Sequence, residues 1–354
     1  MHTKTLRSLI SILTVATTML FVGCASDLSG GRAPVAIVIH GGAGTILKSN
    51  MTPERETAYR EKLSEALQTG HAVLQNGGSS LDAVVASIQV MEDSPLFNAG
   101  IGAVFTSEET NELDSSIMDG STRNAGSVAG VKTIKSPIAA ARLVMESSPH
   151  VMMVGRGAET FARENGLEMV ENSYFRTERR LRQLKRAQQN ESRASVLPYG
   201  SEVGDAPIFP GADHFGTVGA VALDRVGNIA AGTSTGGMTN KRFGRVGDAP
   251  IIGAGTYADN ATCGISATGH GEYFIRGVIA HDVAARMAYA GETLRQAAET
   301  VIMETLGEMG GTGGLIALDR EGNIAMPFNT EGMYRGYIDS AGNEVILIYG
   351  EREE

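Results

Sequence analysis

The alternation of apolar and polar positions divides the first half of the chain into predicted strands and helices. Residues 35–39 form an apolar run with β-branched side chains, which is typical of a buried strand. Residues 53–76 and 80–91 carry apolar positions at helical spacing. Residues 98–131 are rich in glycine and alternate over short stretches, which indicates strands joined by tight turns. Pro137 begins a further predicted helix.

The pattern is interrupted at residues 178–213, which are first heavily charged and then rich in Pro, Gly and Asp. We expect this segment to be an exposed, mobile linker, because such a composition favours surface loops. A chain can be cut in such a linker without exposing its core. The apolar pattern resumes over residues 215–223, which are predicted as a strand.

A short repeat marks the second half of the chain. Residues 222–230, Ala-Leu-Asp-Arg-Val-Gly-Asn-Ile-Ala, recur as residues 317–325, Ala-Leu-Asp-Arg-Glu-Gly-Asn-Ile-Ala. Each copy predicts a β-hairpin whose Gly and Asn can adopt positive φ. Residues 272–289 and 292–307, between the copies, have helical spacing. Hairpins combined with grouped helices favour a layered antiparallel sandwich with helices outside over a doubly wound parallel fold.

Composition narrows the class of protein. The chain has 354 residues, of which 42% are hydrophobic and 20% charged, so it can form a large packed core. Glycine is abundant, with 45 residues, and no collagen-like period accompanies it, so we assign the glycines to turns and close backbone contacts. A net charge of -10, no Trp and 5% aromatic residues argue against nucleic-acid binding. Two cysteines are too few for a disulfide framework or a four-cysteine zinc site.

The N-terminus has the pattern of a bacterial lipoprotein signal. Basic residues precede the uncharged, mostly apolar residues 8–22, which are too few for a spanning helix. The stretch ends in Gly-Cys, and Cys24 stands where a lipobox cysteine is acylated. We therefore predict a signal peptide over residues 1–23 and a periplasmic protein tethered by lipid at Cys24. The absence of an acidic residue directly after Cys24 favours the outer membrane, while an ordinary signal peptide is the alternative. Cys263 lies in an apolar setting and is predicted to be a core residue.

Common catalytic motifs are missing from the sequence. The histidines lack metal-ligand spacing, and neither a Gly-x-Ser-x-Gly elbow nor a phosphate-binding loop occurs. What stands out is Gly216-Thr217 at the start of the apolar strand that follows the linker. A threonine hydroxyl is a weak nucleophile without a base. Cleavage before Thr217 would supply one, because the freed α-amine has a pKa of roughly 7.7 to 8.

Several motifs accompany this threonine in a characteristic order. They are His40-Gly41-Gly42-Ala43-Gly44, Phe97 to Gly102, Leu113 to Gly120, Ser148 to Met153, Gly216-Thr217-Val218-Gly219, the Thr235 segment, Gly244 to Asp248, and Thr268-Gly269. In this order and spacing, from about Val35 to the C-terminal region, the chain resembles the plant-type asparaginase and isoaspartyl dipeptidase family of N-terminal-nucleophile hydrolases.

The resemblance implies both a fold and a processing event. The fold would be α+β, a four-layer α/β/β/α sandwich with antiparallel sheets, in which residues 35–350 form one catalytic domain. The chain would cut itself between Gly216 and Thr217. The products would be an α chain, 24–216, and a β chain, 217–354, that stay together and pair into a dimer of α–β protomers.

The resemblance also assigns roles around the nucleophile. Thr217 would act through its hydroxyl, with its own amine as the base, and Thr235 would hydrogen-bond it. Thr268 and the Gly269 amide would form the oxyanion hole, which stabilises the charge on the attacked carbonyl. Asn98 would support the nucleophile from the α chain.

A second group of residues suits an α-amino acid. Arg245 can grip a carboxylate through two hydrogen bonds, and Asp248 can hold an ammonium group; a surface ion pair is the alternative. By resemblance, Thr268 and Gly269 also bind substrate, and Gly271 lets it approach the backbone. His270 either tunes substrate choice or has no role, and we interpret His40 as structural.

The resemblance implies no cofactor for catalysis but does imply a structural sodium ion, held by main-chain carbonyls of the loop that follows the second helix. By position these carbonyls belong to Met91, Glu92, Ser94, Phe97, Ala99 and Ile101.

The implied activity is hydrolysis of small molecules: the β-aspartyl bond of isoaspartyl dipeptides and the side-chain amide of L-asparagine. A glycosylasparaginase-like hydrolase is one alternative, although Phe215 before Gly216 departs from the His-Asp-Thr junction of that group. An unprocessed lipoprotein that only binds its ligand is a second alternative.

Overall fold

The computed structural model describes residues 35–194 and 216–350, all within one compact unit. The predicted signal peptide, the lipid site at Cys24 and residues 195–215 lie outside the described residues. No helix in the described part of the chain is both long and apolar enough to cross a membrane.

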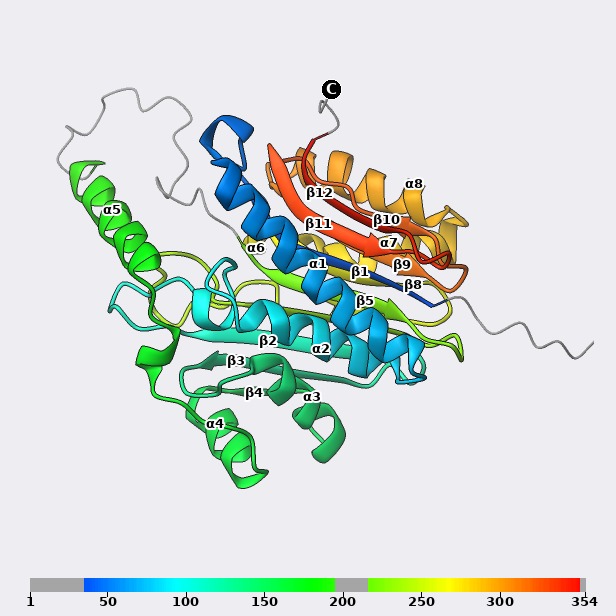
Figure 1. The fold of residues 1–354 in the computed structure, drawn as a ribbon, viewed down its shortest axis with the longest axis horizontal. Helices are drawn as coiled ribbons and strands as arrows, with labels where there is room; N and C mark the ends of the chain where they lie inside the picture. Colours follow the sequence, from blue (N-terminus) through cyan, green and yellow to red (C-terminus); the bar gives the residue numbers. More distant parts are fainter. Residues whose placement is uncertain (1–34, 195–215, 351–354) are drawn as a thin grey trace, which may run out of the picture. The chain divides into compact units, whose positions relative to one another are not determined.

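The larger sheet has eight strands in the order β12-β11-β1-β5-β6-β2-β3-β4 (Figure 1). All of its neighbouring strands are antiparallel except the edge pair β3–β4, which is parallel. The antiparallel prediction is therefore wrong at this edge only. The strands are β1 Ala36–Gly44, β2 Leu113–Asp119, β3 Ala125–Val131, β4 Met152–Val154, β5 Val218–Leu223, β6 Ile229–Thr235, β11 Gly332–Ile338 and β12 Glu344–Tyr349.

The smaller sheet has four antiparallel strands in the order β10-β9-β8-β7. The strands are β7 Thr256–Ala258, β8 Cys263–Gly269, β9 Gly313–Asp319 and β10 Ile324–Ala325. Both predicted hairpins are present, but in different sheets: β5–β6 joins Leu223 to Ile229 in the larger sheet, and β9–β10 joins Leu318 to Ile324 in the smaller one.

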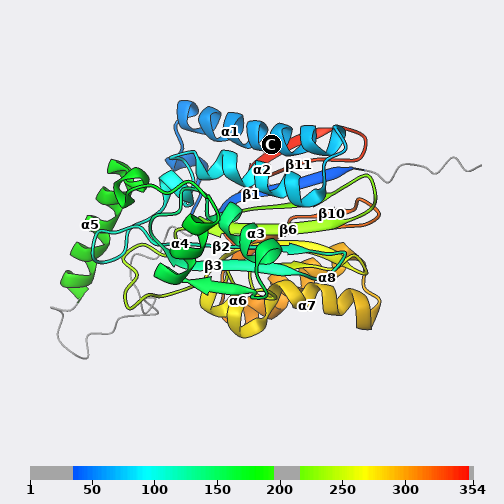
Figure 2. The ribbon, with the colours of Figure 1, turned by 90° about the horizontal axis from the view of Figure 1, so that it is seen from below.

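Helices form the two outer layers. Figure 2 shows α1 and α2 beside the larger sheet, with α6, α7 and α8 on the opposite side of the sandwich. The helices are α1 Pro53–Gln75, α2 Ser80–Glu92, α3 Pro137–Ser147, α4 Gly155–Glu164, α5 Glu178–Ala194, α6 Gly271–Gly277, α7 Ile279–Ala285 and α8 Leu294–Glu299. Short π-helical turns, Arg286–Ala290 and Thr300–Leu306, continue α7 and α8.

Side chains that alternate between the two faces of each strand fill the three interfaces between the four layers. On β1, Ile37 and Ile39 face α1 and α2, whereas Val38 faces the smaller sheet. On β9, Ile316 faces the larger sheet, and Leu315 faces α7 and α8. The buried hydrophobic residues thus form separate clusters on both sides of each sheet, which confirms the predicted α/β/β/α sandwich. Cys263 is fully buried, as predicted.

The start of α2 follows from its local sequence. The Ser79 hydroxyl accepts a hydrogen bond from the Asp82 backbone N–H, and the Asp82 carboxylate accepts one from the Ser79 N–H. This reciprocal capping satisfies two backbone donors that a helix start leaves free. The helix then packs against β5 and β6, the strands that border the candidate site.

The prediction of a mobile linker over residues 178–213 is wrong for its first part, because residues 178–194 form helix α5. Leu184 and Arg180 of this helix are buried, and Arg179 donates hydrogen bonds to the carbonyls of Pro95 and Leu96. The high charge suggested a solvated loop, but one apolar side and long arginine stems anchor the helix to the domain.

Candidate functional site

The candidate nucleophile and its predicted partner lie opposite each other at the end of the β5–β6 hairpin. Val218 pairs with Ser234 in this hairpin, so the same register places Thr217 opposite Thr235. The Thr217 hydroxyl is 3.2 Å from the Thr235 hydroxyl, and both residues are buried. The Gly237 backbone N–H also donates to the Thr235 hydroxyl, at 3.0 Å. Thr235 is therefore held by the turn that follows β6.

The smaller sheet contributes Thr268, the last residue but one of β8. Its hydroxyl oxygen accepts weak hydrogen bonds from the backbone N–H of Thr217, at 3.5 Å, and of Ala43, at 3.3 Å. Since both contacts use the oxygen as acceptor, the hydroxyl hydrogen can point to a third acceptor. An oxyanion formed beside Thr217 would be such an acceptor, and Gly269 follows directly at the end of the strand.

Asn98 supports the site indirectly. Its amide nitrogen donates to the Gly237 carbonyl at 2.7 Å, and its amide oxygen accepts from the Val104 N–H at 2.9 Å. No hydrogen bond joins its side chain to Thr217 among the described residues. Asn98 therefore contacts the turn whose Gly237 N–H donates to the Thr235 hydroxyl.

His40 contributes to packing between the sheets. Its Nε2 atom lies 2.9 Å from the Ser266 hydroxyl, which in turn lies 2.7 Å from the Thr233 hydroxyl. Gly219 is required at this crossing, because a Cβ there would lie 1.9 Å from the Ser266 hydroxyl and 2.5 Å from His40 Nε2. Burial lowers the pKa of His40 to about 3, so the ring is neutral near pH 7. These contacts support its interpretation as a structural residue.

The predicted head-group residues come together on the side of the smaller sheet. Arg245 donates two hydrogen bonds to the Glu272 carboxylate, both 2.9 Å long, in a bidentate arrangement. A Cβ on Gly271 would lie 2.8 Å from Asp248 Oδ1 and 2.9 Å from Arg245 Nη2. The glycine thus lets the guanidinium and the carboxylate approach the same point. We call Arg245, Asp248 and Gly271 the head-group clamp.

The carboxyl group of Asp248 is poised to receive a cation. It is buried, and its Oδ2 atom has no hydrogen-bond partner among the described residues. Burial raises the pKa of Asp248 to about 7, although the charge of Arg245 acts in the opposite direction. A substrate ammonium group would supply the partner that this carboxylate lacks.

Glu272 is a residue of the site to which the sequence assigned no role. Burial alone would raise its pKa, but the hydrogen bonds and charge of Arg245 lower it, so Glu272 is an anion near pH 7. His270 Nε2 lies 3.4 Å from the same carboxylate. Glu272 therefore orients the guanidinium, and a carboxylate that bound Arg245 would have to share or displace this contact. Only its place in the first turn of α6 could have pointed to this role, since it follows the predicted clamp glycine.

The predicted sodium loop is tightly folded around its carbonyls. A Cβ on Gly100 would lie 2.1 Å from the Glu92 carbonyl oxygen, and one on Gly102 would lie 1.9 Å from that of Phe97. The Glu92 side chain is instead engaged with Ser136, Ile138 and Ser234. In the described residues no three His, Cys, Asp or Glu side chains gather as ligands of a metal ion. A site made of main-chain carbonyls stays a prediction.

Comparison with known proteins places the chain in a family. A family model described as asparaginase matches residues 33–348. An isoaspartyl peptidase of Escherichia coli is 52% identical over 322 residues, which are 91% of this chain and 98% of that protein. A putative isoaspartyl peptidase/L-asparaginase of Dictyostelium discoideum is 48% identical, over 85% of this chain and 92% of its own length. An isoaspartyl peptidase/L-asparaginase of Rattus norvegicus is 38% identical, over 84% of each chain.

The chain therefore belongs to the asparaginase family of hydrolases, as the sequence motifs predicted. Its four-layer sandwich agrees with the architecture expected of an N-terminal-nucleophile hydrolase.

Replacement of Gly271 by Ala should break the head-group clamp. The added methyl group would overlap Asp248 Oδ1 and Arg245 Nη2, so affinity for the α-amino acid L-aspartate should fall at least about tenfold by calorimetry. Gly307→Ala is the matched control, because nothing lies within 4 Å of its added Cβ and its φ of −62° is helical. Equal affinity in the two variants would contradict the clamp.

Proposed function

We propose that this protein hydrolyses the β-aspartyl bond of isoaspartyl dipeptides and the side-chain amide of L-asparagine, with Thr217 as the nucleophile. The observation that carries the proposal is the placement of the Thr217 hydroxyl 3.2 Å from that of Thr235, while the Thr217 backbone N–H lies 3.5 Å from the Thr268 hydroxyl. The head-group clamp supplies an independent argument, since it matches the carboxylate and ammonium of an aspartyl group. The printed names of the relatives, isoaspartyl peptidase and isoaspartyl peptidase/L-asparaginase, support the same activity.

The first reaction in this proposal is self-cleavage. The Thr217 hydroxyl oxygen attacks the carbonyl carbon of Gly216, and the C–N bond breaks as its nitrogen takes up a proton. Water then hydrolyses the resulting ester. The products are a carboxylate at Gly216 and a free α-amine on Thr217, which can accept protons near pH 8.

The second reaction is substrate hydrolysis. The Thr217 amine removes the proton from its own hydroxyl, whose oxygen attacks the β-carbonyl carbon of the substrate. The Thr268 hydroxyl and the Gly269 amide stabilise the oxyanion. Collapse expels ammonia or an amino acid and leaves an aspartyl ester on Thr217, and water then releases L-aspartate. The clamp holds only the aspartyl end, so both leaving groups fit one mechanism.

Thr217→Ala should give a single uncut chain without hydrolase activity, because the variant lacks the oxygen that forms both esters. Electrophoresis would show whether the chain is cut, and release of aspartate from isoaspartyl-leucine would measure the hydrolase activity. Thr57→Ala, an exposed threonine of α1, is the matched control and should be cut and active. Cleavage at the same bond in Thr217→Ala would mean that an outside protease makes it.

Binding of the aspartyl group should weaken in acid. Asp248 faces Arg245, Glu272 and Asp114, and its pKa of about 7 means that it becomes neutral as the pH falls below this value. Neutral Asp248 cannot pair with an ammonium group, so inhibition by L-aspartate should weaken about tenfold per pH unit below about 7. Succinate lacks the ammonium group and serves as the control. Parallel pH profiles for the two inhibitors would contradict this role.

We further propose that the protein is a periplasmic lipoprotein anchored through Cys24, on the strength of the N-terminal sequence pattern alone. Metabolic labelling with palmitate should tag the protein, and Cys24→Ser should remove the tag. Cys263→Ala is the control and should keep it, because this thiol is buried. A label that survives Cys24→Ser would refute lipidation at this residue.

Two properties of the assembled enzyme complete the proposal. We expect a dimer of α–β protomers, and a monomeric mass by light scattering would refute it. We expect a structural sodium ion at the carbonyls of residues 91–101, and a melting temperature equal in sodium and in choline buffers of the same ionic strength would argue against it.

A further inference from the structure

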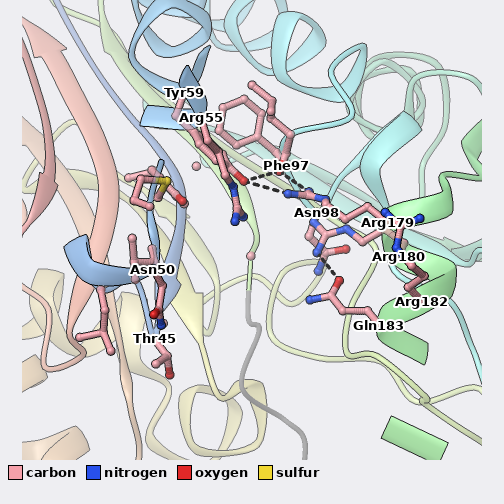
Figure 3. A pocket seen from close by; sticks show the side chains of 18 of the residues that line it. Thr45, Asn50, Arg55, Tyr59, Phe97, Asn98, Arg179, Arg180, Arg182 and Gln183 are labelled. Atoms are coloured by element: carbon pink, nitrogen blue, oxygen red, sulfur yellow. Dashed lines mark hydrogen bonds between the residues drawn. The ribbon is translucent and has the colours of Figure 1, made fainter. Parts of the chain in front are cut away.

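A cavity of about 440 Å³ lies beside the proposed cleavage site. Gly216 and Asn98 form part of its lining, so it reaches the bond that the proposed function requires to be cut. In Figure 3, α1 supplies Arg55 and Tyr59, α5 supplies Arg179 and Arg182, and Thr45 and Asn50 stand on a further side. The cavity shares no lining residue with the head-group clamp.

The described lining of this cavity is strongly basic. It contains no Asp or Glu and five arginines: Arg55, Arg179, Arg180, Arg182 and Arg186. Four of them come from α5, and three of these four form the pattern Arg-Arg-x-Arg within one turn, at residues 179–182. We call this set the arginine cavity. Such a lining creates a positive potential that favours an anionic ligand.

The charge of the arginine cavity is only partly used by the fold. Arg179 donates to the carbonyls of Pro95 and Leu96, and Arg180 donates to the carbonyl of Gly102, so both positions are fixed by neutral acceptors. Within the described chain, Arg182 and Arg186 form no hydrogen bond or ion pair. Burial, and then the neighbouring charge of Arg179, lowers the pKa of Arg180 to about 9. An anion that entered the arginine cavity would relieve the repulsion between the charges of Arg179 and Arg180.

The two proposed substrates differ in whether they have a second carboxylate that could enter the arginine cavity. An isoaspartyl dipeptide has one carboxylate on its aspartyl group, which the clamp holds, and a second on the amino acid that leaves. Asparagine has only the first. The second carboxylate is two bonds from the scissile nitrogen, so a leaving residue beside Thr217 carries it into the surroundings of Gly216.

We propose that the arginine cavity binds the α-carboxylate of the amino acid that leaves, and thereby makes isoaspartyl dipeptides with a free C-terminus the preferred substrates. The inference rests on the proposed function, because it needs Thr217 as the reacting centre. The clamp selects the aspartyl group, and the arginine cavity distinguishes a dipeptide from asparagine or from a longer peptide, in which this carboxylate is an amide.

A substrate pair isolates this contact. Isoaspartyl-leucine and isoaspartyl-leucinamide differ only in the leaving carboxylate, and the ratio of their kcat/KM values does not depend on the fraction of folded enzyme. A charge-assisted hydrogen bond to a carboxylate is worth about tenfold in rate or affinity. We therefore expect the wild-type enzyme to favour the free acid about tenfold or more.

Arg55→Gln, Arg182→Gln and the double variant should bring this ratio toward one, because each removes positive charge from the lining of the cavity. Both arginines are exposed, so they can be changed without opening the core. Arg295→Gln, an exposed arginine of α8 outside the cavity, is the matched control and should keep the wild-type ratio. Added salt should lower the ratio in the wild-type enzyme but not in the double variant.

A wild-type ratio near one, or cavity variants that keep the ratio of Arg295→Gln, would overturn this inference and leave the proposed function standing. Failure of the proposed function has a different signature: neither leucine substrate is hydrolysed, or hydrolysis proceeds without a free Thr217 amine.

Discussion

The hydrogen bond between the Thr217 and Thr235 hydroxyls depends on the register of one hairpin. With Val218 opposite Ser234, the two threonines meet at the end of β5 and β6, and a shift by one residue would turn one of them to the other face. The smaller sheet adds Thr268 from β8 across the interface between the sheets. Because all three residues occupy strand ends, their positions follow from the packing of the two sheets, and a mobile loop is not needed to assemble them.

Charge is arranged differently on the two sides of this threonine cluster. In the head-group clamp, Arg245 already has an anionic partner in Glu272, whereas buried Asp248 lacks a partner for one oxygen. In the arginine cavity, the described lining has guanidinium groups and no acid. An aspartyl group needs both signs of charge close together, whereas a leaving carboxylate needs only positive charge. The proposed function and the further inference thus assign chemically different ends of one substrate to the two sides.

The sequence predicted the parts of this site that are local. The hairpin repeat and the apolar runs of β1 and β5 follow from side-chain spacing, and the resemblance to a family indicated the three threonines, Arg245 and Asp248. The sequence could not predict the Arg245–Glu272 contact, because 27 residues and a change of element separate the two side chains. Nor could it predict that α5 is a helix, since the side chains that anchor its charged sequence contact loops from the first third of the chain.

We propose that breaking one backbone bond creates the base that activates Thr217. A time course of purified precursor tests it most directly: mass spectrometry follows the appearance of a fragment that begins at Thr217, and aspartate release from isoaspartyl-leucine is measured in the same samples. Activity should be zero at the start and rise in proportion to that fragment. Full turnover by an entirely uncut chain would contradict it.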